Sequence, residues 1–268
     1  MKKVKGIEIY ACSNCQLGFL DEKGLKKQRS LKISYTPDEY EKQECKLRRR
    51  FLELSEVIRL YKKSGRVLDL GAGFGLFASI LQEKGYDLTV VEPANDPFYV
   101  KKGAKIYKKT FENFFKTNRQ KFDVIIMMDI IEHLINPLQA LLQAKSSLSE
   151  GGIIVIQTPN FQSLMAKMCK DWSWWMVEDH KFFFTPQSLS AMAGGAGLRE
   201  VFSKTYEDFP DFKKNLDGNF SGIRNKFFKK AYKGIYFILF FSFYLAFRKF
   251  LWKNNFGGLI FSIYKKNV

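Results

Sequence analysis

The sequence predicts an α/β protein built on a doubly wound, mainly parallel sheet. Short apolar runs alternate along the chain with segments whose apolar residues recur at helical spacing. One run, FDVIIMM at residues 122–128, is almost continuously apolar, as strands are when a parallel sheet buries both of their faces. A chain of 268 residues is long enough for one large domain of this kind with an extension.

The first half of the chain is expected to supply most of the strands. Residues 1–20 are β-like and contain two cysteines, and 35–63 carry apolar residues at helical spacing among many charges. The elements expected next are a strand at 66–70, a helix at 75–84 that ends at Gly85, strands at 88–92 and 104–108, and the apolar strand at 122–128.

The second half continues the alternation. It is expected to contain a helix at 137–148, a turn at 150–152, a strand at 153–157, a helix at 186–196 closed by Gly197, and strands at 198–204 and 257–264. Between the last two strands lie about 50 residues, of which 234–247 (GIYFILFFSFYLAF) are uncharged. This length indicates an insertion before the final strand.

Charge is unevenly distributed along the chain. The formal net charge is +17, and residues 218–268 contain ten Lys or Arg with no Asp or Glu. A surface this basic favours an anionic partner such as lipid, phosphate or nucleic acid. The amino terminus, MKKVKGIEIY, lacks the apolar core of a secretory signal, so a reducing cytoplasm and free cysteines are expected.

A glycine-rich loop follows the strand at 66–70. Gly71, Gly73 and Gly75 lie in the stretch VLDLGAGFGLFASIL, where backbone N–H groups can approach a ligand closely. The dinucleotide pattern requires a third glycine at position 76, which is Leu76, and no G-K-[ST] follows. Glu92 ends the next strand, where a carboxylate can accept hydrogen bonds from both ribose hydroxyls. The loop therefore favours a nucleoside cofactor over a plain turn.

Four stretches in order carry a family resemblance: DLGAGFG at 69–75, VVEP at 90–93, FDVIIMMDIIEHLINP at 122–137, and EDHKFFFTPQSLSAMAGGAGLREV at 178–201. They resemble class I S-adenosylmethionine-dependent methyltransferases, particularly the branch with ubiquinone-pathway O-methyltransferases and many sugar and lipid methyltransferases. The resemblance covers about residues 60–205. It implies a Rossmann-like, seven-stranded sheet whose last strand is antiparallel, with S-adenosylmethionine as cofactor.

The resemblance also implies roles for matching positions. Asp69 and the loop Gly71-Ala72-Gly73 with Gly75 would surround the methionine part of the cofactor. Glu92, with Pro93, would bind the ribose, and the chain at Phe111 would lie by the adenine. Asp129 would face the methionine end and the acceptor.

The same reading divides the chain into four parts. Residues 1–60 form a ribbon-like segment and a helix, and 61–205 form the cofactor-binding domain. Residues 206–256 form a basic, aromatic, helical insertion, and 257–268 contribute the final strand.

Candidates for chemistry lie in the matched motifs. Methyl transfer to oxygen benefits from a base, and the two histidines of the chain are His133 and His180. The catalytic candidates are His180, His133 and Asp129. Asp129, Glu132 and His133 would share one side of a helix. Carboxylates and an imidazole could hold Mg²⁺, and the resemblance implies this too, because a comparable cluster in the ubiquinone-pathway enzymes is implicated in magnesium binding. The alternatives are a helix-dipole role for the acids and a structural or substrate-facing role.

Two further motifs leave alternatives open. The C-x-x-C at Cys12 and Cys15 lacks the second pair that a structural zinc site needs, so bound Zn²⁺ is not expected. DWSWW at 171–175 is either core packing, a cover over the site, or an apolar wall for an aromatic, prenyl or sugar acceptor.

The apolar segment at 234–247 is shorter than the ~20 residues that span a bilayer. The interpretations are a monotopic helix contacting the membrane surface through 224–253, a helix packed on the domain itself, or a homodimer contact. A true membrane span is a further, less favoured alternative, because it would carry Arg248 and Lys249 inward. The first of these interpretations places the protein in the cytoplasm, peripherally on the inner face of the membrane.

The function predicted from these observations is S-adenosylmethionine-dependent methylation, on an oxygen of a small-molecule, glycan or lipid-linked acceptor. The alternatives are C- or N-methylation of a sugar, or a nucleic-acid-binding protein such as an RNA methyltransferase. A nucleic-acid partner is not expected, because the basic charge lies beside an apolar segment without a recognised RNA module. An oxidoreductase ranks third, since Leu76 replaces the expected glycine.

Overall fold

A computed structural model describes residues 2–28, 36–169, 172–207, 213, 215 and 225–267. The chain groups into two compact units. The large-sheet unit comprises Lys32–Gln157, Ser190–Phe202 and Ser262–Val268, and the aromatic unit comprises Met1–Leu31, Thr158–Leu189 and Ser203–Phe261. Each unit is described by itself.

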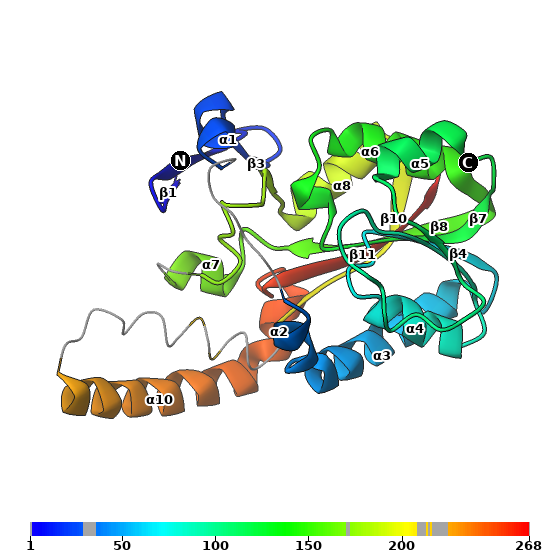
Figure 1. The fold of residues 1–268 in the computed structure, drawn as a ribbon. Coiled ribbons are helices and arrows are strands. Elements are labelled where there is room, and N and C mark those ends of the chain that lie inside the picture. Colours follow the sequence, from blue (N-terminus) through cyan, green and yellow to red (C-terminus); the bar gives the residue numbers. More distant parts are fainter. Residues whose placement is uncertain are drawn as a thin grey trace. The chain divides into compact units, whose positions relative to one another are not determined.

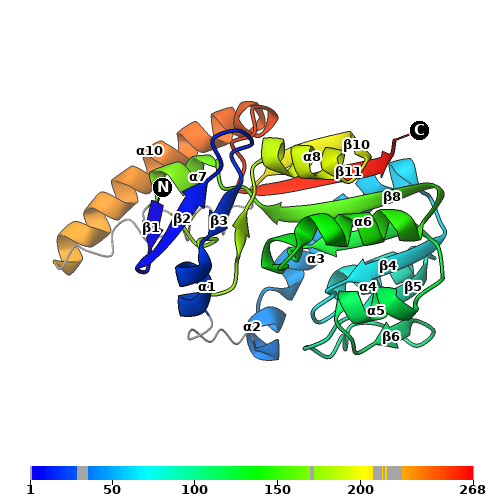
Figure 2. The same cartoon turned by 90° about the horizontal axis from the view of Figure 1, so that it is seen from above.

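The principal sheet has seven strands in the order β10-β11-β8-β7-β4-β5-β6. The pairs β4·β5, β4·β7, β5·β6 and β7·β8 are parallel, whereas β11 runs opposite to β8 (Figure 2). This confirms the predicted fold class. The strands are β4 (Arg66–Leu70), β5 (Asp87–Val91), β6 (Lys105–Tyr107), β7 (Phe122–Met128), β8 (Leu148–Pro159), β10 (Leu198–Tyr206) and β11 (Leu259–Lys266).

The register of the central strands brings their carboxyl ends to one edge of the sheet. Asp69 on β4 pairs with Val90 on β5 and with Ile126 on β7. The residues that follow β5 and β7, Glu92 and Asp129, therefore emerge at the same edge as the loop that follows β4. This is the edge at which open α/β sheets bind ligands.

Helices cover both faces of this sheet (Figure 1). On one face lie α3 (Glu44–Tyr61) and α4 (Leu76–Glu83), and on the other lie α5 (Phe111–Thr117) and α6 (Pro137–Ser147). Helix α3 is amphipathic and buries Leu47, Phe51, Leu54 and Ile58 at intervals of three and four residues. These buried residues are among the apolar residues whose spacing predicted a helix here.

The single helix predicted at 35–63 is wrong. The structure has two helices, α2 (Pro37–Glu41) and α3, and residue 35 lies outside the described residues. Between the helices the N–H of Gln43 donates to the carbonyl of Tyr40 at 2.9 Å. This tighter, i to i−3 bond ends α2 after little more than one turn.

Several short elements were not predicted, among them α1 (Glu22–Gln28) and three others. Helix α5 has the sequence FENFFKT, in which three Phe recur at helical spacing but only Phe114 is buried. Seven residues are too few to establish that period from the sequence. Helix α7 (Leu164–Met168) and strand β9 (Phe182–Phe183) are too short for periodicity to reveal. Helix α8 (Pro186–Gly195) lies where it was predicted.

The aromatic unit has its own four-stranded sheet in the order β1-β2-β3-β9. The strands β1 (Lys2–Val4), β2 (Ile7–Ala11) and β3 (Gly18–Leu20) precede the short helix α1 (Glu22–Gln28). A Cβ added to Gly18 would come within 2.8 Å of the Phe183 Cβ, so glycine permits the close approach of β3 and β9.

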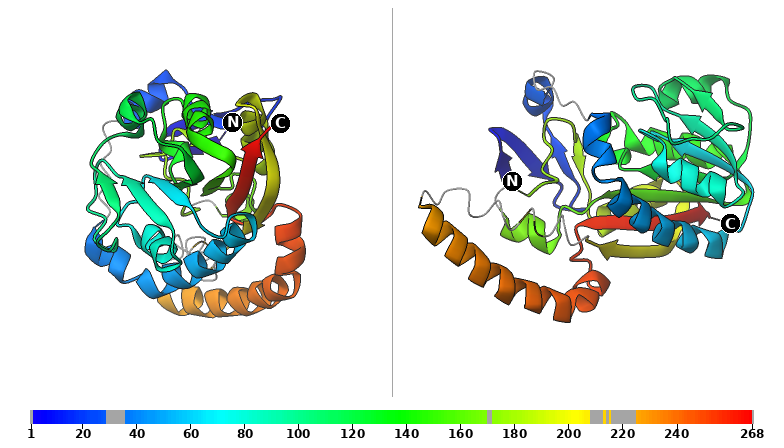
Figure 3. Two further views of the ribbon diagram at one scale, coloured as in Figure 1. Left: turned by 90° about the vertical axis from the view of Figure 1, so that its right-hand side faces the viewer. Right: turned by 60° about the horizontal axis from the view of Figure 1, so that its bottom comes forward.

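Helix α10 (Lys226–Lys253) contributes to the core of the aromatic unit and is one continuous helix (Figure 3). Trp172 and Trp175 of DWSWW are buried in that core, and their rings meet edge to face at 5.1 Å. Of the readings left open for this motif, core packing describes these two tryptophans; Asp171 lies outside the described residues.

Candidate active site

The glycine loop joins β4 to α4 and depends on left-handed backbone conformations. Gly71 has φ +73°, and a Cβ there would lie 2.2 Å from the Ile130 Cδ1. Gly75 has φ +85° and is the N-cap of α4; a Cβ there would lie 2.6 Å from the Val100 Cγ2. Both positions therefore require glycine for conformation and for space.

Gly73 differs from its neighbours. Its φ is +57°, but a Cβ there would meet no atom within 4 Å. Its N–H donates to Glu92 Oε2 at 2.8 Å. The loop thus presents open backbone at Gly73, held against a buried carboxylate, which is the surface that a nucleoside ligand can approach.

The Glu92 side chain is only 4% exposed and is fixed by backbone donors. Its Oε1 accepts the N–H groups of Ala94 and Asn95 at 2.8 and 2.9 Å, in addition to the Gly73 bond at Oε2. Pro93, which has no N–H, is exposed between them. An ionised carboxylate offers about four lone-pair sites, so Glu92 retains capacity to accept from a ribose hydroxyl.

Asp69 is buried at the end of β4. Burial, and secondarily the charge of Glu92, raises the pKa of the Asp69 carboxyl to about 7. A cation placed nearby would relieve both effects. The pair therefore suits a ligand that carries positive charge close to a ribose, as S-adenosylmethionine does.

Asp129 follows β7 in a strained conformation, with φ +52°. Its N–H donates to the Gln157 carbonyl at 2.9 Å, and the Gln157 side-chain amide donates to Asp129 Oδ2 at 2.8 Å. Gln157, fully buried on β8, was missed from sequence. The signal was available, because parallel β7 and β8 place the end of one beside the end of the other.

The expected helix through Asp129, Glu132 and His133 is wrong. Only Ile131–His133 forms a 3₁₀ turn, and Asp129 precedes it with positive φ, so i, i+3 and i+4 spacing does not place the three side chains on one helical face. Glu132 is buried, and its Oε1 lies 4.0 Å from His133 Nε2. The metal assignment to these residues stays a prediction.

An aromatic cluster beside the glycine loop was also missed. Phe74 packs edge to face with Tyr40 of α2 at 5.0 Å and lies 5.4 Å from Phe98. Tyr99 donates from its hydroxyl to Glu44 Oε2 at 3.0 Å, and burial together with this bond raises the pKa of Tyr99 to about 12. Phe111 begins α5 and contacts Phe115 across 6.4 Å.

His180 belongs to the aromatic unit and is 2% exposed. Its backbone N–H donates to the Met176 carbonyl at 2.7 Å, and its carbonyl accepts from Gln28 Nε2 at 3.0 Å. Its ring lies edge-on to Phe183. The backbone around His180 is therefore held firmly within this unit.

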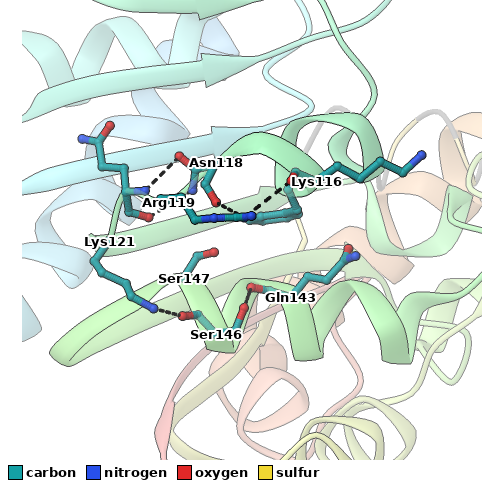
Figure 4. A pocket seen from close by; sticks show the side chains of 9 residues that line it. Lys116, Asn118, Arg119, Lys121, Gln143, Ser146 and Ser147 are labelled. Carbon is teal, nitrogen blue, oxygen red and sulfur yellow. Dashed lines mark hydrogen bonds between the residues drawn. The ribbon is translucent and has the colours of Figure 1, made fainter.

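A separate pocket of about 360 Å³ lies in the large-sheet unit at the amino end of β7 (Figure 4). Lys116, Arg119 and Lys121 line it together with Gln143 and Ser146 of α6. Glu92 and Asp129 follow the carboxyl ends of β5 and β7, so this pocket is distinct from the glycine-loop site.

The fold and the site together define an α/β protein whose glycine loop and buried Glu92, at the carboxyl edge of the sheet, suit a nucleoside ligand. The model of the methyltransferase domain family matches residues 40–201. The chain belongs to this family and is an S-adenosylmethionine-dependent methyltransferase. That conclusion confirms the class predicted from the sequence motifs.

Individual relatives agree at modest identity. The ubiquinone biosynthesis O-methyltransferase of Serratia proteamaculans is 28% identical over 174 residues, covering 58% of this chain and 72% of that protein. The corresponding protein of Aeromonas salmonicida is 27% identical over 175 residues, covering 58% and 74%.

Solved structures share the fold. A methyltransferase from Archaeoglobus fulgidus has a TM-score of 0.55 at 19% identity, covering 81% of this chain and 92% of its own. The [4+2]-cyclase SpnF has a TM-score of 0.51 at 14% identity, covering 81% and 82%. Because a cyclase shares the fold, the reaction is not inferred from fold alone.

Proposed function

We propose that the protein methylates an oxygen of a small-molecule acceptor, as the names of the two ubiquinone-biosynthesis relatives state for those proteins. The observation that carries the cofactor half of this proposal is the buried Glu92, held by Gly73 beside open backbone. We further propose that the acceptor is a phenolic or other hydroxyl compound, with glycan and lipid-linked acceptors as the extended class.

Different residues at the carboxyl edge of the sheet would bind different parts of the cofactor. Asp69 and the backbone of Gly71–Gly75 would hold the methionine part, Glu92 and Pro93 the ribose, and Phe111 the adenine. When bound, S-adenosylmethionine supplies a methyl group on a positively charged sulfur, which is a good leaving group. Gln157 would keep Asp129 oriented toward the acceptor side through the 2.8 Å bond.

Catalysis would rest on positioning the acceptor and removing its proton. In-line displacement depends chiefly on alignment, and a base that takes the hydroxyl proton contributes typically ~10²–10⁴-fold. We propose His180 as that base, with His133 and Asp129 as acceptor contacts. Support comes from the stretch EDHKFFF, which resembles the corresponding stretch of the family and contains His180.

Magnesium at Asp129, Glu132 and His133 is retained as an alternative role for these side chains. Carboxylate and imidazole ligands suit a divalent cation, and no zinc role is proposed for Cys12 and Cys15. The alternative is checked by assaying the purified enzyme with EDTA and then with added Mg²⁺. Activity that is unchanged by either treatment excludes the metal.

We propose a cytoplasmic location, with peripheral association to the inner face of the membrane through residues 224–253. We also propose that the chain is divided functionally into a ribbon-like segment with a helix (1–60), the cofactor-binding domain (61–205), the basic insertion (206–256) and the final strand (257–268).

A homodimer contact is the alternative role of the apolar helix.

The acceptor is identified by supplying cofactor with an isotopically labelled methyl group to an extract, with and without the purified protein. Labelled products are then separated, and the chemical shift of the methyl carbon distinguishes O-, N- and C-methylation. A product with an O-methyl group supports the proposal. Exclusive labelling of a sugar nitrogen or carbon contradicts it.

A further inference from the structure

Helix α10 has two apolar faces, and the core of its unit accounts for only one. Tyr236, Phe237, Phe240 and Phe241 pack against the aromatic core, in which Tyr244 and Leu251 are buried. The Tyr244 hydroxyl donates to the Glu207 carbonyl at 3.3 Å. This inner face fixes the helix to the aromatic unit, as the self-packing reading of the segment expected.

The outer face is equally apolar but exposed. Its large side chains recur every three or four residues and are between 47% and 68% exposed, so they form one stripe along the helix. They are Ile235, Ile238, Leu239, Phe243, Phe247 and Phe250. Soluble monomers rarely leave a continuous apolar stripe of this length open to water.

Basic side chains lie at both ends of the stripe. The sequence around it, residues 218–268, contains no Asp or Glu. Lys230, which is exposed, and the half-buried Lys233 precede it. At the other end, Lys249 lies directly before Phe250 and Lys253 follows, both at exposed positions. Residues 218–268 contain ten Lys or Arg in all. An apolar stripe between basic ends is complementary to an anionic lipid surface, in which acyl chains lie beneath negative headgroups.

The same charges argue against a second copy as the occupant. Both ends of the helix are basic, so pairing the stripes of two copies in either direction would place lysines opposite lysines. No acidic residue in 218–268 could offset that repulsion.

A transmembrane position fits less well than a position in the interface. By length and composition, Lys230–Lys253 could cross a membrane. Its uncharged part, the 14 residues 234–247, is only about 21 Å long at ~1.5 Å per residue, against a hydrocarbon core of ~30 Å. Crossing would also remove Tyr244 and Leu251 from the core they occupy.

We propose that the outer stripe of α10 is a docking surface for an anionic membrane leaflet, with the helix lying along the interface while its inner face stays packed on the aromatic unit. The inference deepens the membrane association in the proposed function and rests on it. It names the side chains that enter the lipid and the class of lipid that they require.

The test is flotation of the full-length protein with vesicles of phosphatidylcholine alone and of phosphatidylcholine with phosphatidylglycerol. We expect flotation with the anionic vesicles only. Leu239→Glu and Phe250→Glu should each lower partitioning about tenfold or more, because each places a charge where an apolar side chain would be buried. Leu60→Glu, at an 82% exposed position on α3, is the matched control and should float like the wild type.

Two results would overturn the proposal: wild-type protein that stays at the bottom with anionic vesicles, or outer-stripe variants that float normally. If light scattering shows a dimer that these variants dissociate, the occupant is a second copy instead. Calorimetric titration of S-adenosylmethionine into the wild type and each variant measures cofactor binding separately from membrane docking. A wild type that floats but binds no cofactor contradicts the proposed methyl transfer and still supports the membrane-docking surface.

Discussion

The amide of Gly73 donates to the Oε2 of Glu92 at 2.8 Å, and this bond ties the loop after β4 to the end of β5. Together with the donors from Ala94 and Asn95, it fixes a buried carboxylate before any ligand arrives. A receptor group held in place in advance loses little entropy on binding. In the proposed cofactor site, the loop and the carboxylate would therefore act as one preorganised receptor.

Glu92→Gln tests the carboxylate. The amide keeps the size of the side chain but replaces one charged acceptor by a donor that faces backbone N–H groups. A hydrogen bond to a charged group is worth ~1.5–3 kcal/mol, so S-adenosylmethionine should bind about 10- to 100-fold more weakly by calorimetry. Asp96→Asn, at a side chain 82% exposed, is the control. Unchanged affinity in Glu92→Gln would remove Glu92 from the cofactor site.

Gly73→Ala tests the open backbone. The left-handed conformation makes alanine cost roughly 1–2 kcal/mol of folding stability, and the added methyl would point into space that is empty of protein atoms. Gly85 also has positive φ and no atom within 4 Å of an added Cβ, but it follows α4 at the other end of that helix. Both variants should lose similar stability in thermal unfolding, and only Gly73→Ala should lose cofactor affinity.

The raised pKa of Asp69 predicts how the folding stability depends on pH. The pKa of its carboxyl is raised to about 7 in the folded protein from an ordinary 3.8, so the folded state holds this proton more tightly than the unfolded chain. The contribution of Asp69 to folding stability is therefore greatest at pH values below its ordinary pKa of 3.8 and is lost as the pH rises toward 7. Asp69→Asn removes the titration, so its melting temperature relative to wild type should rise across this range and level off above it.

Cofactor binding should also change the protonation of the Asp69 carboxyl. A positive ligand near Asp69 lowers the pKa of its carboxyl, so binding near pH 6 should release a proton. Calorimetry in buffers of different ionisation enthalpy measures that release. An identical enthalpy in every buffer would show that binding releases no proton and would contradict the prediction. A release that persists in Asp69→Asn would show that another group supplies the proton.

The sequence predicted the parts of this molecule whose signals are local. Strands β4 and β7 coincide with their predicted bounds because each is a mainly apolar run between clear breaks in the sequence. Glycines flank β4 at 65 and 71, and Lys121 and Asp129 flank β7. The glycine loop was recognisable because its conformations admit few other residues. Gln157 and the Tyr40–Phe74 contact were missed because they join residues far apart in the chain.

The wrong prediction of a helix through Asp129 shows how a local pattern can mislead. Spacing of i, i+3 and i+4 is meaningful only if the backbone is helical, and Asp129 has φ +52° with its N–H bonded to β8 instead. The tertiary bond prevailed over the local pattern. Likewise, the composition of α10 could not separate packing from membrane contact, because its inner and outer faces carry the same kinds of side chain.

His180→Ala tests the proposed base. Its backbone is held by Met176 and Gln28, so loss of the ring should leave the surrounding chain in place, and a thermal melt verifies that. Turnover should fall by ~10²–10⁴-fold with calorimetric affinity for S-adenosylmethionine unchanged. A base that must be deprotonated also sets the acid limb of the pH–rate profile, and that limb should disappear in the variant. If His180→Ala turns over normally while His133→Ala does not, the proton is taken by His133, and His180 serves to hold the segment between β8 and α8.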